Sequence, residues 1–479
     1  MKVFAKSLFL LAGLAPAIAQ AQTTTLTTKF QHVVVIFQEN RTPDNLFQGL
    51  CTSPGLCSTT PTTSQYNIQT KNWLDKSHAG GVIQPGTVML DNAYDLSHRH
   101  DAFVAQCDLD TATGNCTMDG AAGVHCSGTC PTNPQFKFVD NSTGILDPYL
   151  ALAKQYGWAN YMFQTNQGPS FPAHQFIFGA TSAPNLHDDR IGTFAAENMS
   201  VQGMGAGCIA QPGVTVQLID AAGVEDPNNK IFPCFDHDTV ADLLKPLSIH
   251  WRYYAPSAGS IWTAPNAIRH ICDPINGQCQ GADWQSSVDL TPADVLRHAS
   301  SPNCDLRPVS WVIPKGQNSD HANGNTGGGP SWVASIVNTI GTSTCKNPDG
   351  TSYWESTAIF ITWDDWGGWY DHEPPTILGS PQGGYQLGFR VPLIVVSAFT
   401  PAGNINNNRH DFGSIIRFIE QNFGIAEGAL TFADQRAKND LTGFFTLSTA
   451  RPFKPIPSAL DAAFFLNDTT PATDPDEDN

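Results

Sequence analysis

Two stretches of the sequence carry acidic or amide side chains directly after a short, β-rich apolar run. Asp364 and Asp365 follow one such run, and Glu39 and Asn40 follow another near the N-terminus. Three carboxylates and an amide oxygen form the hard oxygen set that divalent cations prefer, and three like charges held together without a cation would be unfavourable. We therefore predict that these four residues bind a divalent metal ion, whose identity the ligand types leave open.

Ser170 is a candidate nucleophile. It lies between Pro169 and Pro172, directly before a helix that we expect to begin near Pro172, so one interpretation is a helix N-cap. The other is catalytic, because a hydroxyl at a helix N-terminus sits where backbone N–H groups attract phosphate oxygens. Local sequence leaves both interpretations open. The predicted metal ion favours the second, since an alcohol nucleophile needs a cation or a base to become an alkoxide.

Three histidines are candidates for acid–base chemistry or for phosphate binding. His98 and His100 open a predicted helix that Asp95 or Ser97 caps; being two residues apart, they face different sides, so at most one reaches a shared site. His321 follows a third apolar strand, where it could protonate a leaving oxygen or hold a phosphate. Solvent exposure or simple packing is the alternative for each.

The segment Asp236-His237-Asp238 is rich in metal-ligand types and precedes a predicted helix. It is either a second metal site or a loop in which Asp238 caps the helix. The Gly-rich segment 327–330 lacks the Lys-Ser/Thr ending of a nucleotide-binding loop, so we interpret it as a turn before a helix.

Strands, polar strand ends and helices alternate along the chain, which predicts an α/β fold with a mainly parallel sheet. Ligands bind at the carboxyl ends of strands in such sheets. A helix capped by Asp411 and ended by Gly424 has one apolar stripe. The other expected helices begin at 146 and span 331–340, and the expected strands span 33–37, 161–163, 249–254, 309–313, 358–362 and 390–397.

The two ends of the chain differ from its middle. Residues 1–21 combine two lysines, a short apolar core and small residues before the expected cleavage point, as in a secretory signal peptide. No later apolar run has the length of a transmembrane helix. We predict one catalytic domain at 28–455, with insertions near 43–90, 105–145 and 182–235, followed by a tail at 456–479 whose Pro- and Asp-rich end is disordered.

The 12 cysteines are an even set, as expected for an exported protein, which is secreted or, in a Gram-negative cell, periplasmic. Zinc binding is the alternative, but the spacings do not repeat a CxxC pattern. The simplest disulfide pairing joins neighbours along the chain: Cys51 with Cys57, Cys107 with Cys116, Cys126 with Cys130, Cys272 with Cys279, Cys208 with Cys234 and Cys304 with Cys345.

The formal net charge is −18, which argues against a basic surface for nucleic acid. A negative field also slows the approach of anionic substrates unless the site itself is locally positive, and a bound metal ion would provide that positive charge.

Several motifs together resemble the phosphoesterase family of bacterial phospholipases C and secreted acid phosphatases. The likeness spans about 30–424, includes Arg390-Val-Pro392 and the Asp411 helix, and rests mainly on Gln-Glu-Asn-Arg-Thr at 38–42, Gly-Pro-Ser-Phe-Pro at 168–172, Ser-Asp-His at 319–321 and Thr-Trp-Asp-Asp-Trp-Gly-Gly-Trp-Tyr-Asp-His at 362–372.

The resemblance implies an alkaline-phosphatase-like α/β/α core of three layers and metal-assisted hydrolysis of phosphate esters. It implies Glu39, Asn40, Asp364 and Asp365 as the metal ligands and Ser170 as the nucleophile. Phospholipase-type members tend to carry threonine in place of Ser170, followed by Pro-Asn-Arg, whereas this chain continues Phe-Pro-Ala-His to residue 174. That departure favours the acid phosphatase branch.

We therefore predict an exported, metal-dependent phosphomonoesterase of the acid phosphatase type, acting on a small phosphorylated substrate. His321 and His98 would stabilise phosphoryl charge or protonate the leaving alcohol, which favours turnover at mildly acidic pH. One alternative is a phospholipase C-type phosphodiesterase acting on phospholipid head groups. The other is an inactive binding protein that holds calcium for structure.

Overall fold

The computed structural model describes residues 29–198, 204–375 and 387–473. The predicted signal peptide and the last six residues of the predicted tail lie outside the described residues.

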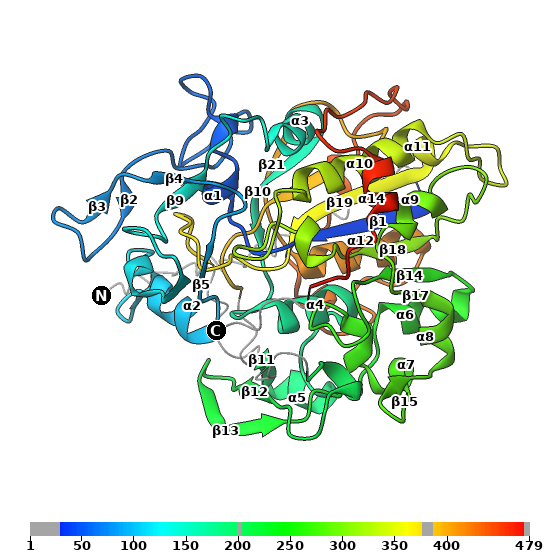
Figure 1. Ribbon diagram of the computed structural model, residues 1–479, viewed down its shortest axis with the longest axis horizontal. Helices are drawn as coiled ribbons and strands as arrows, with labels where there is room; N and C mark the ends of the chain where they lie inside the picture. The colour runs from blue at the N-terminus through cyan, green and yellow to red at the C-terminus, as the bar shows by residue number, and fades with distance from the viewer. Residues whose placement is uncertain (1–28, 199–203, 376–386, 474–479) are drawn as a thin grey trace, which may run out of the picture.

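An eight-stranded sheet forms the centre of the molecule, with the strand order β17-β14-β18-β1-β19-β20-β10-β21 (Figure 1). All neighbouring strands are parallel except β20, which runs antiparallel to both β19 and β10. The prediction of a mainly parallel sheet is confirmed. The strands are β1 (His32–Gln38), β10 (Gly157–Phe163), β14 (Trp251–Tyr254), β17 (Val288–Asp289), β18 (Val309–Val312), β19 (Thr357–Trp363), β20 (Leu393–Val396) and β21 (Asn404–Asp411).

Helices cover both faces of this sheet, as the pleat of β1 demonstrates. Phe37 and Gln38 are neighbours on the strand, so their side chains point to opposite faces. Phe37 packs against Phe412 of α12 (Phe412–Phe423). Trp363, in register with Gln38, packs against Tyr149 of α3 (Asp147–Gln155). The protein therefore has the three α/β/α layers that the resemblance implied.

Within each layer, long helices pack in pairs. Contacts join α3 to α10 (Gly329–Thr342) in one layer and α12 to α4 (Ser170–Gly179) in the other, and Figure 1 shows α3 and α10 above the central strands with α4 below them. The shorter helices are α1 (Pro43–Leu46), α2 (His100–Cys107), α5 (Leu186–Ile191), α6 (Val240–Leu244), α7 (Arg269–Cys272), α8 (Ala282–Ser287), α9 (Asp294–His298), α11 (Tyr353–Ser356), α13 (Ala433–Arg436) and α14 (Ala462–Asn467).

Small sheets of two or three strands lie outside the core. The two-stranded sheets pair β2 (Trp73–Leu74) with β3 (Val82–Ile83), β4 (Gly86–Val88) with β9 (Lys137–Val139), β5 (Tyr94–Leu96) with β8 (Cys126–Gly128), β6 (Leu109–Asp110) with β7 (Asn115–Cys116), and β15 (Pro274–Ile275) with β16 (Gln278–Cys279). A three-stranded sheet consists of β11 (Phe194–Asn198), β12 (Val216–Ile219) and β13 (Glu225–Ile231). Most of these segments fall in the regions predicted as insertions.

Predictions of helix ends had mixed outcomes. Asp411 caps α12 by accepting a hydrogen bond from the Ser414 backbone at 3.1 Å, and Gly424 ends it with φ 74°, both as predicted. The predicted caps Asp95 and Ser97 are wrong, because Asp95 lies in β5 and α2 begins only after Arg99. Asp238 is not a cap either.

The cap that replaces Asp238 is Thr239, whose side chain and backbone N–H are bonded by Asp242 three residues later in a reciprocal capping box. The cap therefore lies one residue later in the chain than the prediction placed it.

All six predicted disulfides are present, so every cysteine is used and zinc binding by cysteine is excluded. Four of the six join cysteines that are fewer than ten positions apart, so each of these stabilises a local loop and does not connect distant parts of the fold.

The C-terminal segment packs back on the layer of α10. Phe465 of α14 contacts Trp332 with a ring separation of 5.2 Å, and the Lys315 ammonium donates to the Thr470 carbonyl at 2.7 Å. Thr470 and Pro471, which belong to the end predicted to be disordered, thus each accept a hydrogen bond from the rest of the fold. Among the described residues, no helix combines the length and apolar character that crossing a membrane requires.

Candidate active site

The predicted metal ligands meet at the carboxyl ends of two neighbouring strands. Gln38 of β1 and Trp363 of β19 are partners in a parallel ladder, so Glu39 and Asp364 emerge side by side. The Asn40 backbone N–H donates to Asp364 Oδ1 at 3.1 Å, which ties the two strand ends together. Glu39, Asn40, Asp364 and Asp365 are all fully buried.

A tight backbone approach fixes the loop after Asp365. Asn40 has a positive φ of 61°, and a Cβ on Gly367 would lie 2.3 Å from the Asn40 carbonyl oxygen, so no larger residue fits there. The Gly367 N–H donates to Asp365 Oδ1 at 2.7 Å. Gly367 therefore contacts the Asn40 backbone and holds the Asp365 carboxylate in place.

Ser170 is the first residue of α4, and its hydroxyl faces the acidic cluster. Pro169 takes the N-cap position, so the interpretation of Ser170 as an N-cap is wrong. The Ser170 Oγ lies 3.3 Å from Glu39 Oε2 and 3.3 Å from Asp365 Oδ2. The Ser170 hydroxyl thus contacts carboxylates that lie 131 and 195 residues away in the sequence.

His174 belongs to the same cluster, although its sequence context predicted no role for it. Its Nε2 lies 3.2 Å from Glu39 Oε1 and 3.9 Å from Asp364 Oδ2. Residues four apart share one face of a helix, so the spacing from Ser170 to His174 was the signal that could have found it.

His98 lies at the site and His100 does not. Only one of the two reaches it, as predicted, but His98 precedes α2, so the spacing expected for a helix is not the reason. His98 Nδ1 donates to the Leu96 carbonyl at 2.9 Å, which leaves Nε2 to accept from the Asn40 amide at 3.1 Å. His100 turns toward the Gln167 carbonyl instead. His98 therefore orients the Asn40 carboxamide, and its contact with a phosphoryl group stays a prediction.

His321 lies beside His98, with ring centroids 5.8 Å apart. Its Nδ1 donates to the Ala322 carbonyl at 2.7 Å, so Nε2 is the nitrogen left for another partner. The third strand end thus brings a second imidazole to the edge of the cluster.

Charge at the centre of the site is not neutralised by the protein. Burial, followed by the neighbouring Asp364 and Asp365, raises the pKa of Glu39 well above its usual range. Burial lowers the pKa of His174 to about 4. Within the described part of the chain, neither Glu39 nor Asp364 is ion-paired with a lysine or an arginine.

The donor set fits a divalent cation. Asn40 Oδ1 and Asp364 Oδ2 are buried and accept no hydrogen bond from the described residues. One ligand atom each from Glu39, His174 and Asp364 lies within 4.8 Å of the other two. Buried oxygen acceptors that converge without donors are the arrangement that a metal ion satisfies.

A second acidic cluster lies close by in sequence and is neutralised internally. Asp371 receives two hydrogen bonds from the Arg390 guanidinium, at 3.0 and 2.9 Å, and Asp44 receives one from His372 Nδ1 at 2.6 Å. Arg390 Nη2 also lies 3.7 Å from Asp44. Since its charges are paired, this cluster holds loops together.

The segment Asp236-His237-Asp238 does not form a metal site. His237 Nδ1 bonds the Asp238 carbonyl at 2.8 Å, and the groups of possible ligands found among the described residues do not include this segment. Loop geometry, rather than a metal ion, accounts for these three residues.

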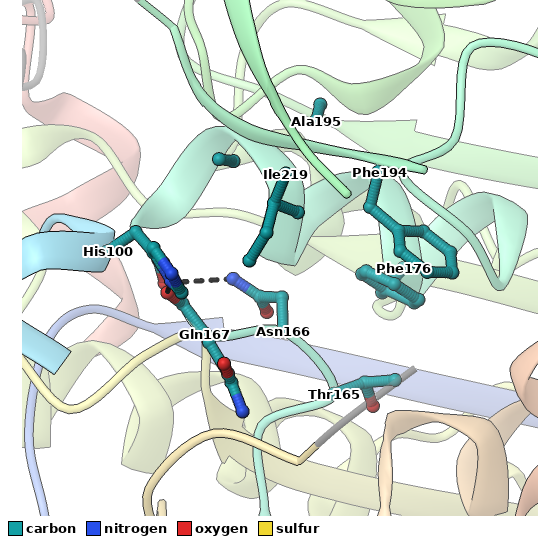
Figure 2. Close-up of a pocket in the computed structure, with 10 residues that line it drawn as sticks. His100, Thr165, Asn166, Gln167, Phe176, Phe194, Ala195 and Ile219 are labelled. Carbon is teal, nitrogen blue, oxygen red and sulfur yellow. Dashed lines mark hydrogen bonds between the residues drawn. The ribbon is translucent and has the colours of Figure 1, made fainter. Parts of the chain in front are cut away.

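A narrow, mostly apolar pocket lies beside the loop that leads to Ser170. Figure 2 shows His100 and Gln167 on one side, Phe176 and Phe194 on the other, with Asn166 and Ile219 between them. Neither Ser170 nor any of the site's carboxylates lines it. The pocket is therefore separate from the reacting groups.

Comparison with known proteins identifies the family. The profile of the Phosphoesterase family matches residues 30–426. The chain belongs to the phosphoesterase family. Membership puts it among hydrolases that act on phosphoric ester bonds, in agreement with the resemblance seen in the sequence.

Curated relatives in this family are phospholipases C. Phospholipase C B of Mycobacterium tuberculosis is 22% identical over 89% of this chain and 80% of its own length. Non-hemolytic phospholipase C of Pseudomonas aeruginosa is 24% identical over 50% of this chain, and the match spans only 37% of that protein. A solved protein of the alkaline phosphatase superfamily from Vibrio parahaemolyticus superposes with a TM-score of 0.31 and 11% identity over 59% of this chain and 61% of its own.

Proposed function

We propose that this protein hydrolyses phosphate esters with Ser170 as the nucleophile. The observation that carries the proposal is the position of the Ser170 hydroxyl, buried and 3.3 Å from carboxylate oxygens of both Glu39 and Asp365. A single hydroxyl proton has two acceptors there, so its removal needs no rearrangement.

Glu39, Asn40, Asp364 and Asp365 would hold a divalent metal ion, which supplies Lewis-acid stabilisation of phosphoryl charge when bound. The side chains of these residues enter from the ends of two strands, so their positions are fixed by the sheet rather than by mobile loops. His98 keeps the Asn40 oxygen directed into the site by binding its amide nitrogen.

The reaction has two displacements. Ser170 Oγ attacks phosphorus as its proton passes to Glu39 or Asp365; the bond from phosphorus to the leaving oxygen breaks, and that oxygen takes a proton from His321. Water then attacks the phosphoserine and gives a proton to His321, the bond between phosphorus and Oγ breaks, and Ser170 regains its proton from Glu39 or Asp365. The first amides of α4 and its dipole favour the negative charge of the phosphoryl group.

The substrate that the relatives favour is a phosphodiester. The curated relatives are phospholipases C, which supports a phospholipase C-type diesterase over the acid phosphatase type expected from the sequence. In that reaction the leaving alcohol is the diacylglycerol and the product is the phosphorylated head group. Phosphomonoester hydrolysis is the second candidate, favoured by the departure from Pro-Asn-Arg in the residues after Ser170.

One set of assays separates these activities. Purified protein is given p-nitrophenyl phosphate, p-nitrophenylphosphorylcholine and phosphatidylcholine micelles in parallel. Cleavage of both choline substrates supports the diesterase, and cleavage of the monoester alone supports the phosphatase. If no ester is cleaved in the presence of Mg²⁺, Ca²⁺, Mn²⁺ or Zn²⁺, the protein is a binding protein and the proposal fails.

We propose an exported location for the protein. Six disulfides form stably only in an oxidising compartment such as the exterior or the periplasm. The N-terminal segment that would direct export is the predicted signal peptide at 1–21.

A further inference from the structure

We propose that His174 binds the metal ion through Nε2, so that the site is a mixed nitrogen and oxygen site that prefers Zn²⁺ or a similar transition metal to Mg²⁺ or Ca²⁺. This inference rests on the proposed function, because it concerns the metal ion of the same site.

The hydrogen bonds of Tyr253 fix the tautomer of His174. The Tyr253 hydroxyl donates its one hydrogen to the Trp262 carbonyl at 2.8 Å. Its contact of 3.3 Å with His174 Nδ1 must therefore run the other way, with Nδ1 as the donor. In the neutral ring, a hydrogen on Nδ1 leaves a lone pair on Nε2.

That lone pair points at carboxylate oxygens. Nε2 lies 3.2 Å from Glu39 Oε1 and 3.9 Å from Asp364 Oδ2, and the latter oxygen has no hydrogen-bond donor among the described residues. One proton can bridge two of these three acceptors and leaves the third unsatisfied. A cation between them satisfies all three.

The separations agree with shared coordination. Two ligands about 2.1 Å from one metal ion stand roughly 3.0 to 3.4 Å apart in octahedral or tetrahedral geometry. The 3.2 Å between His174 Nε2 and Glu39 Oε1 falls in that range, and the 3.9 Å to Asp364 needs only a small closing movement.

The ring of His174 is also held in place. Trp262 lies nearly parallel to it, with centroids 6.4 Å apart and an angle of 20° between the rings, and Phe37 packs at 5.9 Å. A histidine that donates its other N–H to a fixed acceptor is the usual form of a metal-ligating imidazole. Here that acceptor is the Tyr253 hydroxyl.

A nitrogen ligand changes which metal ion the site selects. Imidazole suits zinc and other transition metals, whereas magnesium and calcium are bound by oxygen. The four oxygen-bearing residues alone would suit the hard cations. His174 is the residue that moves the preference toward Zn²⁺.

The test measures metal binding rather than turnover. Metal-free wild-type protein and the variants His174→Ala, His174→Gln and His32→Ala are titrated with Zn²⁺ and with Mg²⁺ by calorimetry. His32 is the control, because it is a buried histidine at the far end of β1, which keeps it away from the site. We expect both His174 variants to lose at least about 100-fold in Zn²⁺ affinity while Mg²⁺ affinity is little changed.

A spectroscopic measurement reports the bond itself. Cu²⁺-loaded wild-type protein and His32→Ala should show imidazole nitrogen coupling by pulsed electron paramagnetic resonance, and His174→Gln should lack it. Coupling and Zn²⁺ affinity that survive in both His174 variants overturn the inference. Loss of coupling in a protein that cleaves no phosphate ester leaves the inference standing and removes the proposed function instead.

Discussion

The loops after β1 and β19 build two acidic clusters, and only one of them contains its own positive charge. Glu39 and Asp364 meet beside Ser170 with no lysine or arginine paired to either among the described residues. A few residues further along the same loops, Asp44 and Asp371 meet around the Arg390 guanidinium. Burial is complete in both places.

The two clusters differ in role because only one has its buried carboxylates paired with an arginine. A buried carboxylate with a two-pronged arginine is satisfied, so the protein gains a stable junction between loops. Buried carboxylates without such a partner lower the stability of the empty fold, and they persist where a ligand neutralises them. The first cluster is thus suited to a metal ion and a reaction, and the second cluster stabilises the loops beside it.

The largest effect should follow from removing the hydroxyl at the first cluster. Ser170→Ala should lower kcat by at least about 10⁴-fold, because no covalent intermediate can form. Ser310→Ala removes another buried hydroxyl, on β18, and should retain nearly normal rates with the same ester substrates. Near-normal activity of the Ser170 variant would remove this residue from the mechanism.

A change in the second cluster, around Arg390, should lower the free energy of unfolding. Asp371→Asn leaves the buried Arg390 guanidinium with the Asp44 carboxylate, 3.7 Å away, as its ion-pair partner among the described residues, and we expect a loss of about 3 to 5 kcal/mol in the free energy of unfolding. Arg297→Met, which breaks an exposed pair with Asp294, should change stability by less than about 1 kcal/mol. Denaturant titration of both variants measures this difference, and equal effects would contradict it.

The same chemical change at the first cluster should have the opposite sign. In chelator-treated protein, Glu39→Gln removes the carboxyl group whose pKa is raised by burial and by the neighbouring Asp364 and Asp365, so unfolding should become harder by about 1 kcal/mol. With saturating metal ion the order should reverse, because a charged ligand is lost. A variant less stable than wild-type protein in chelator would show that the cluster is neutralised without a metal ion.

A third carboxyl pair, Glu420 with Asp434, should make the stability of the protein depend on pH. Glu420 is hydrogen-bonded to Asp434, and burial, together with the charge of Asp434, raises the pKa of Glu420 to about 8 from an ordinary 4.5. The folded protein therefore holds this proton more tightly than the unfolded chain. Stability should fall as pH rises from 4.5 to 8, and this contribution should be fully present only at the acidic end.

Glu420→Gln should remove that dependence, because the amide keeps a hydrogen for Asp434 at every pH. The midpoint of thermal unfolding of the variant, relative to wild-type protein, should rise by roughly 2 °C or more between the two ends of this pH range. Parallel pH dependences in the two proteins would show that Glu420 and Asp434 share no proton.

Elements with strong local patterns could be predicted from the sequence. Apolar runs identified the inner strands because strands buried on both faces need apolar side chains throughout. Asp411 and Gly424 identified α12 because caps act within a few residues. β21 escaped notice, since its sequence Asn-Ile-Asn-Asn-Asn-Arg-His-Asp is polar and its pairing with β10 supplies the stability.

The sequence by itself determined the chemistry of each strand end: which residues bear carboxylates, where the hydroxyl precedes a helix, and which cysteines are near enough to pair. Only the tertiary structure decided which of these groups meet. The register of β1 with β19 places Glu39 beside Asp364, and the docking of α4 adds His174. Distances between residues remote in sequence depend on how strands pair and helices pack, and the local sequence does not determine them.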